Sequence, residues 1–282
     1  MRRTRHVIAS GAIYAGYIAV CLIFLFPLLW VASLSLRPMA ELFAYPPRLM
    51  PLNPTLAAYR DVLFVSPLAH YLLNSVKLVC ATVVCALAIA VPSAYALSRL
   101  RFRRPASKPL VMLAMVAVQL ISPLVTALPL YRWFSAIGLI NSHFAVILVY
   151  VALSAPFATW MLTGFFDTVP AALDEAARID GCSRLQSLHR VLLPVMLPGL
   201  ASTAILLAIS TWGQFIVPFV LLTRVDLYPV SVGILDYQSS SDSVSTHLLA
   251  AAAIVSALPA MLTFLVLQRF IIGALTLGAV KG

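Results

Sequence analysis

Charged residues are scarce in this chain. They make up 10% of its 282 residues, while 62% are hydrophobic and the mean hydropathy is +1.00. A soluble domain of this length exposes far more charge, so the composition excludes that class and predicts a polytopic helical membrane protein. The formal net charge is +10, but the basic residues lie at the ends of apolar runs. They form no basic patch with interleaved aromatics, which argues against a nucleic-acid partner.

Catalytic and metal-binding patterns are also lacking. The sequence has no GxxxxGK[S/T] loop for the phosphates of ATP, no GxSxG elbow and no HExxH helix. Its four cysteines show no CxxC pair and no Cys/His ligand spacing, so we expect small buried hydrophobes. An intramembrane hydrolase or a lipid-modifying enzyme would need a nucleophile–base pair that the sequence does not supply. We therefore expect no enzyme, no metal site and no cofactor in this chain.

Ionisable residues are nearly absent from the apolar runs. Lys77 lies within one of them, close enough to its end for the ammonium group to reach the interface. An ion-coupled secondary transporter for a small solute would need ionisable groups inside its spans as proton or sodium sites. That function stays open as the alternative.

Apolar runs long enough to cross a membrane predict six helices. They lie at about 11–35, 71–97, 110–131, 144–166, 200–222 and 248–271. The first run is too long for the apolar part of a cleaved signal peptide, so we expect an uncleaved span. Lys and Arg favour the side that carries both termini and the polar segment at 167–199, which the positive-inside rule places in the cytoplasm. We expect a single transmembrane domain over 1–282.

The polar segment at 168–193 has the pattern of two short helices. Pro170 suits the first turn of a helix, and 171–179 is rich in helix-forming residues. Gly181 suits the left-handed residue that ends a helix, and Ser183 with Gln186 resembles a capping box that begins the next one. A charged helix pair between two spans needs a partner in water.

The same segment suggests which side chains face that partner. Asp174 and Arg178 are four residues apart and can pair on one helix face. Ala176 and Ala177 are expected to form a flat surface, beside which Glu175 and Asp180 can accept charge-assisted hydrogen bonds. One apolar stripe is expected at Leu185, Leu188 and Leu192. The alternative, an amphipathic helix lying on lipid, expects a basic polar face, whereas this segment is rich in acids.

At these residues the chain resembles the permease subunits of binding-protein-dependent ABC importers. The shared motif reads EAA, then D-G, then L-P. It is matched by Glu175, Ala176, Ala177, Asp180, Gly181, Leu193 and Pro194. The likeness covers nearly the whole chain and is closest to the second permease subunit of maltose-type carbohydrate importers. Supporting segments are Tyr71-Leu-Leu-Asn-Ser75, Tyr95-Ala-Leu-Ser-Arg-Leu-Arg-Phe102, Pro129-Leu-Tyr131, Gly138-Leu-Ile-Asn141 and Gly278-Ala-Val-Lys-Gly282. The fifth span departs from the family's usual Trp-Asn-Glu-Phe, because it reads Trp212-Gly-Gln-Phe215.

The resemblance implies a fold and partners. The fold would be the six-helix type I permease of ABC importers, in the bacterial cytoplasmic membrane. The partners would be a homologous sister permease, two ATP-binding subunits that hold ATP and Mg, and an extracytoplasmic solute-binding protein. The ATPase-coupling residues would be Glu175, Ala176, Ala177, Asp180, Gly181 and Leu185, and the tail at 278–282 would also reach the ATPase.

A sugar or polyol is the implied cargo, and the sister subunit would make most contacts with it. Carbohydrate sites combine aromatic faces with polar groups that match hydroxyls. Within the spans the candidates are Asn74, Gln119, Tyr150, Trp160, Trp212 and Gln214. For each of them, core packing or a hydrogen bond between helices is the competing explanation.

Overall fold

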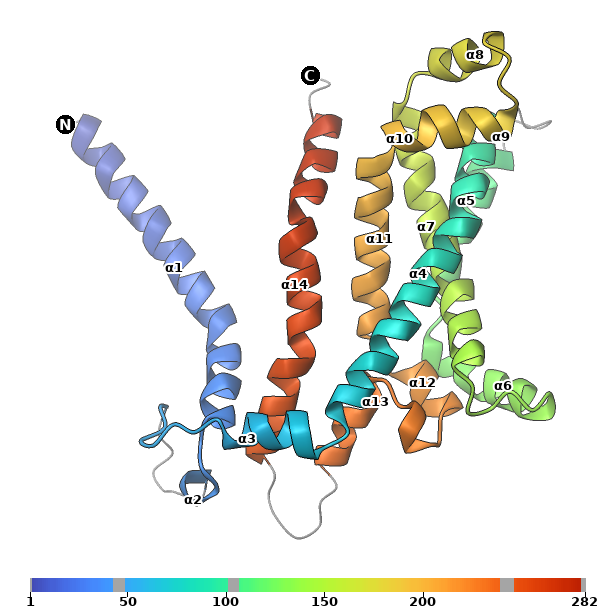
Figure 1. Ribbon diagram of the computed structural model, residues 1–282. Helices are drawn as coiled ribbons and strands as arrows, with labels where there is room; N and C mark the ends of the chain where they lie inside the picture. The colour runs from blue at the N-terminus through green and yellow to red at the C-terminus, as the bar shows by residue number, and fades with distance from the viewer. Residues whose placement is uncertain (1, 43–48, 101–106, 239–245, 280–282) are drawn as a thin grey trace. The chain divides into compact units, whose positions relative to one another are not determined.

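The protein is described by a computed structural model. The backbone is described for residues 2–42, 49–100, 107–238 and 246–279, and the side chains for 13–42, 49–100, 107–238 and 246–265. Within these ranges the chain is helical and has no strand (Figure 1). In chain order the elements are α1 (Arg2–Ser35), α2 (Met39–Leu42), α3 (Ala57–Arg60), η1 (Asp61–Val65), α4 (Leu68–Arg99), α5 (Ser107–Val118), α6 (Pro123–Ala136), α7 (His143–Thr168), α8 (Ala171–Ile179), α9 (Arg184–Gln186), η2 (Ser187–Leu192), α10 (Leu193–Val195), α11 (Leu197–Trp212), α12 (Ile216–Leu221), η3 (Val225–Leu227), α13 (Val230–Gly233), η4 (Ile234–Tyr237) and α14 (Thr246–Ala279).

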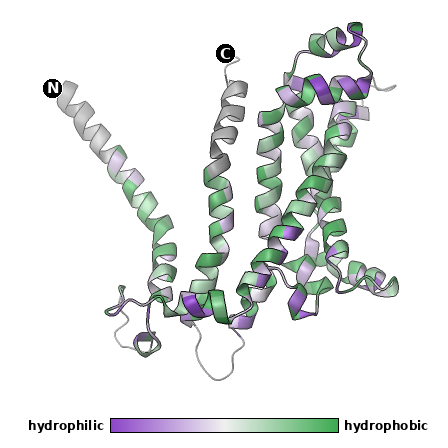
Figure 2. Cartoon of the chain, viewed as in Figure 1, coloured by the Kyte–Doolittle hydropathy of each residue, from purple (hydrophilic) through white to green (hydrophobic). Residues whose placement is uncertain are grey.

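Four helices among the described residues are long and apolar enough to cross a membrane. They are Ile13–Ser35, Leu68–Arg99, His143–Thr168 and Thr246–Leu265. Two pairs of consecutive helices are also long and apolar enough when each pair is taken together. The helices of the pair α5 and α6 are bent by 84° at the break between them, and Arg184–Val195 is bent by 81° relative to α11. Six spans result if each bent pair counts as one. The predicted all-α membrane class is confirmed, and the side on which the termini lie stays a prediction. Figure 2 shows hydrophobic residues along most of α4 and hydrophilic ones gathered in α8 and α9.

One of the bends interrupts the stretch predicted to span at 110–131. α5 ends at Val118 and α6 begins at Pro123, with Ser122 extended between them (φ −63°, ψ 130°). Proline has no N–H to continue the helix and keeps the preceding residue out of the α region. Apolar length alone does not reveal such a change of direction.

The chain divides into two compact units. The first contains residues 1–69 and 234–257. Within it the Tyr59 hydroxyl lies 2.7 Å from Ser35 Oγ, and the Arg37 guanidinium lies 5.2 Å from the ring centre of Trp30. Both contacts anchor the segment that follows α1.

The second unit contains residues 70–233 and 258–282. Its core joins α4, α7, η2 and α11, and small residues of α4 let the helices approach closely. Ala86, Ala90 and Ala94 are fully buried at four-residue spacing, against Leu162 and Phe166 of α7. Within this unit α8 to α10 lie at one end of α4, α7 and α11, and α12 lies at the other end (Figure 1).

Candidate functional site

The polar segment folds as two short helices joined at a glycine. Gly181 has φ +85°, the left-handed conformation that follows α8. Ser183 Oγ then accepts from the Gln186 amide at 3.3 Å, and Gln186 Oε1 accepts from the Ser183 amide at 2.8 Å. The predicted glycine turn and capping box are confirmed.

The inner face of α8 is held by a buried carboxylate. Asp174 accepts a hydrogen bond from the Tyr95 hydroxyl, at 3.1 and 3.3 Å to its two oxygens, and another from Ser187 Oγ. Among the described residues it forms no ion pair with Arg178, so the pairing expected from the i, i+4 spacing is wrong. The reason is the burial of Asp174, which lies only 8% exposed against α4 and η2.

The burial of the alanine pair and of the leucines also differs from expectation. Ala177 shares the inner face with Asp174 and is buried, so only Ala176 contributes to an exposed surface. Leu188 and Leu192 are buried, while Leu185 is 73% exposed. The expected single stripe is wrong because the chain becomes a π-helix at Ser187–Leu192, which changes the angular step between side chains.

The name α8 surface is used here for five exposed residues of this loop: Glu175, Ala176, Ile179, Asp180 and Leu185. The exposed residues Arg178 and Arg184 lie in the same loop and line a hollow with Glu175. Sequence reasoning missed Ile179, which is 86% exposed. At about 100° per residue, a helix that buries positions 174 and 177 directs position 179 outward, but the folded structure is needed to show that Asp174 is buried.

One ion pair and two hydrogen bonds hold the base of this loop. The Lys108 ammonium lies 3.0 Å from the Asp167 carboxylate, which also accepts from Ser98 Oγ at 2.6 Å. The Arg99 guanidinium donates to the Val169 carbonyl at 2.7 Å. These contacts join the ends of α4, α5 and α7 beside the point where α8 begins.

The expected pathway residues meet only in part. Tyr150, Trp212 and Gln214 line one very small cavity, of about 10 Å³, together with Ser75 and Ser231. It lies at the break between α11 and α12, where the Gln214 carbonyl accepts from the hydroxyls of Tyr150, at 3.4 Å, and Ser231, at 2.8 Å.

The other pathway candidates lie elsewhere. The Asn74 side chain is buried and bonded to the carbonyls of Asp226 and Tyr228. Gln119 donates to the Leu153 carbonyl at 2.9 Å, and Trp160, 41% exposed, packs beside Phe157. Asn74 and Gln119 thus make hydrogen bonds to backbone carbonyls, and Trp160 makes an aromatic packing contact.

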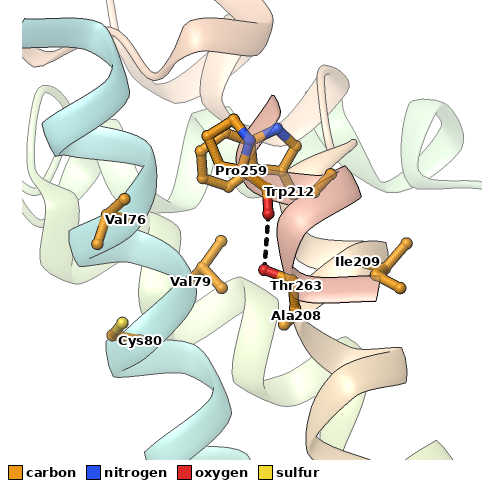
Figure 3. Close-up of a pocket in the computed structure, with 9 residues that line it drawn as sticks. Val76, Val79, Cys80, Ala208, Ile209, Trp212, Pro259 and Thr263 are labelled. Carbon is orange, nitrogen blue, oxygen red and sulfur yellow. Dashed lines mark hydrogen bonds between the residues drawn. The ribbon is translucent and has the colours of Figure 1, made fainter. Parts of the chain in front are cut away.

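A second hollow, of about 150 Å³, is also lined by Trp212 (Figure 3). Its lining is mostly apolar: Val76, Val79, Cys80, Ala208, Ile209, Trp212, Pro259, Ala260 and Thr263. The Thr263 hydroxyl donates to the Pro259 carbonyl of its own helix, at 2.7 Å. Among the described residues no group of three or more His, Cys, Asp or Glu could hold a metal ion.

Comparison with known proteins identifies the family. The group described as binding-protein-dependent transport system inner membrane component matches residues 83–275. The chain belongs to this family of inner membrane components. As a member it is a multi-pass transport subunit rather than an enzyme. The ion-coupled alternative finds no support in these similarities.

Relatives of this transport component extend over nearly its full length. The sulfoquinovosyl glycerol transport system permease protein of Agrobacterium fabrum is 35% identical over 259 residues, 92% of this chain and 89% of the relative. The trehalose/maltose transport system permease protein of Thermococcus litoralis is 32% identical over 270 residues, 95% of each. A chain from the crystal structure of a bacterial ABC transporter involved in alginate import has the same fold, with TM-score 0.79 and 24% identity over 95% of this chain and 98% of that one. The permease fold expected from the sequence is confirmed.

Proposed function

We propose that this inner membrane component is the permease subunit of an ATP-driven importer for a carbohydrate or a related polyol. The names of the two relatives given above refer to the transport of sulfoquinovosyl glycerol and of trehalose and maltose. No charged side chain lines either cavity near Trp212 among the described residues. A neutral sugar or polyol is therefore favoured, with the sister permease supplying most of its contacts.

The observation that carries the proposal is the α8 surface. Ile179 and Leu185 expose apolar side chains in a polar loop that also exposes the carboxylates of Glu175 and Asp180. Protein interfaces combine apolar anchors with a polar rim in this way. The partner proposed for this surface is a separate ATP-binding subunit that holds ATP and Mg.

The wider assembly follows the family pattern. Two permeases, this one and a homologous sister, would enclose a central pathway, with a solute-binding protein on the outer side and two ATP-binding subunits in the cytoplasm. The segment at 168–193 and both termini would then be cytoplasmic. Closure of the ATP-binding pair would move α8 and open the pathway outward, a rigid-body form of alternating access. The tail at 278–282 is expected to reach the ATPase, and its residues 280–282 lie outside the described residues.

The test is purification of the tagged chain in mild detergent, with partners identified by mass spectrometry and ATP hydrolysis measured. We expect an ATPase, a sister permease and a binding protein to be recovered. The substitution Glu175→Lys should remove the ATPase from the complex without changing membrane insertion. The matched control is Asp61→Lys, which reverses an exposed carboxylate in the predicted outer loop. Recovery of the chain alone, or an intact and fully active Glu175→Lys complex, would contradict the proposal.

Among the pathway candidates, Gln214 is the one we expect to influence transport. Its side chain lines the small cavity beside Trp212. The substitution Gln214→Leu should change uptake kinetics severalfold and leave assembly intact, because the carbonyl bonds from Tyr150 and Ser231 do not use the side chain. Unchanged uptake kinetics would remove Gln214 from the pathway.

A further inference from the structure

The segment at 223–233, between α12 and η4, contains only the short helices η3 and α13. The backbone N–H groups of Leu227, Tyr228, Val232 and Gly233 pair with carbonyls of the segment itself. Other buried peptide groups of the segment need partners outside it. Side chains from two separate helical regions supply them. Both regions coincide with segments that carried the family resemblance and have no assigned role, at 71–75 and 138–141.

The first set of contacts comes from α4. The Asn74 amide donates to the Asp226 carbonyl at 3.0 Å and to the Tyr228 carbonyl at 3.1 Å. His70 Nε2 lies 2.7 Å from the same Asp226 carbonyl, and it must donate there because a carbonyl only accepts. Asn74 is 2% exposed. The loss of its side-chain amide would remove this donor from the Tyr228 carbonyl, while the Asp226 carbonyl would keep the bond from His70.

Two further residues of α4 contact the segment nearer its C-terminal end. Ser75 Oγ accepts from the Val230 amide at 2.8 Å. Tyr71, fully buried, lies against Gly233, where a Cβ would come within 2.1 Å of its ring. Gly233 therefore has no room for a side chain while Tyr71 keeps this position.

The second set comes from the turn before α7. Asn141 has φ +60°, unusual for a residue with a side chain, and its backbone N–H donates to the Leu221 carbonyl at 2.9 Å. Its Oδ1 accepts from the amides of Thr223, at 2.6 Å, and Arg224, at 3.1 Å. His143 Nε2 donates to the Leu227 carbonyl at 2.8 Å.

The segment held in this way is also joined to the helix break near the candidate pathway. The Ser231 hydroxyl donates to the Gln214 carbonyl at 2.8 Å, and Tyr150 donates to the same carbonyl. One continuous set of bonds thus runs from the exposed turn at Arg224 to the cavity beside Trp212. Arg224 and Asp226 are ion-paired at 2.7 Å on the exposed side of this turn.

We propose that Asn74 and Asn141 are positioning residues that clamp the segment at 223–233 to α4 and α7, so that force on its exposed turn reaches the break at Gly213–Gln214. This role rests on the proposed function, in which the turn faces the binding-protein side. Asn141 holds the turn through its side-chain oxygen, which accepts two backbone N–H groups, and its Nδ2 also lies 2.9 Å from Thr223 Oγ1. Asn74 holds the turn through its side-chain amide.

The clamp itself is tested without transport. A spin label is placed on Val225→Cys in the full-length chain with Cys21, Cys80, Cys85 and Cys182 replaced by serine, and a control label is placed on Ile179→Cys. We expect Asn141→Gly, which accepts the positive φ but lacks the side chain, to mobilise the Val225 label and leave the control label unchanged. Asn141→Asp, which keeps the accepting oxygen, should match the parent. Equal mobility in all three chains would overturn the clamp.

The role in transport is tested in the assembled complex with its ATPase and binding protein. We expect Asn141→Gly and Asn74→Ala to lower the maximal uptake rate at least tenfold, with basal ATP hydrolysis and the half-saturating substrate concentration within twofold of the parent. Asn141→Asp should restore the rate to within twofold. Uptake by Asn141→Gly at the parental rate, equal loss in Asn141→Asp, or failure of both Asn74→Ala and Asn141→Gly to assemble would overturn the proposal. A parent complex that shows no ATP-driven uptake would instead contradict the proposed function, while the label mobility still decides the clamp.

Discussion

At the scale of single residues, the contacts of Asp174 decide how α8 is held. Its carboxylate receives the Tyr95 hydroxyl from α4 and the Ser187 hydroxyl from η2, both buried. A hydrogen bond to a charged group contributes about 1.5–3 kcal/mol. We expect Tyr95→Phe to weaken the local stability of α8 by roughly that amount.

Hydrogen exchange of the α8 amides measures this effect. Exchange should quicken about tenfold for each 1.4 kcal/mol lost. Asp174→Ala combined with Tyr95→Phe should cost less than the two single changes together, because they remove one shared bond. Additive effects would show that the two groups do not interact.

A second residue-scale prediction concerns pH and the segment after α1. Hydrogen bonds from the Leu52 amide, and further ones from Asn53, hold the pKa of Glu41 below its ordinary value of 4.5. Because the folded-state pKa is the lower one, the contact is fully present above pH 4.5 and is lost as the pH falls through the lowered value.

Amide exchange at Leu52 and Asn53 tests the pH dependence. Protection in the parent chain should fall as the pH drops below 4.5 and passes through the lowered pKa of Glu41. Glu41→Gln should remove this dependence, since glutamine keeps an accepting oxygen that does not titrate. An identical loss of protection in that variant would contradict the assignment.

Sequence patterns predicted the structure correctly where a residue's contacts lie within a few positions of it in the chain. The glycine turn at Gly181 and the capping box of Ser183 depend on neighbours within a few positions. The burial of Asp174 depends on Tyr95, 79 positions away, so no local pattern could separate it from an exposed acid. The same limit applies to Asn74. Its residue type and its place in a span predicted a contact with substrate, whereas its side chain donates hydrogen bonds to two backbone carbonyls more than 150 positions away.

At the scale of elements, apolar length predicted where helices occur but not where they turn. The bend between α5 and α6 lies inside one predicted span, and the break after Trp212 lies inside another. Pro123 and Gly213 mark these positions. Several other prolines, among them Pro92 and Pro156, remain inside continuous helices, so proline alone does not predict a break.

Packing of α11 on α7 gives an element-scale prediction. A Cβ at Gly199 would lie 2.7 Å from the Phe165 ring of α7. We expect Gly199→Ala to destabilise the helix pair by about 1–3 kcal/mol, because the ring would have to move. The cost should shrink in a Phe165→Ala background. Unfolding in detergent, followed by helical circular dichroism, measures it, and an equal cost in both backgrounds would contradict the contact.

At the scale of the whole molecule, the chain leaves much apolar surface uncovered. Only 6% of the most apolar window of α1 is buried, and Phe24 is 74% exposed. A soluble monomer rarely exposes so much, whereas a membrane subunit can cover it with lipid or another subunit. Composition alone predicted this class. Composition does not predict which sugar is carried, because the binding protein and the sister subunit contribute to substrate selection.

The central claim is that a separate ATPase drives this permease through the α8 surface. The most direct test is uptake of labelled sugars into proteoliposomes that contain the complete complex, with ATP inside, binding protein outside and a protonophore present. We expect uptake that requires ATP and the binding protein, survives the protonophore and disappears in Glu175→Lys. Uptake that collapses with the protonophore while ATP is maintained, or that persists in Glu175→Lys, would contradict it.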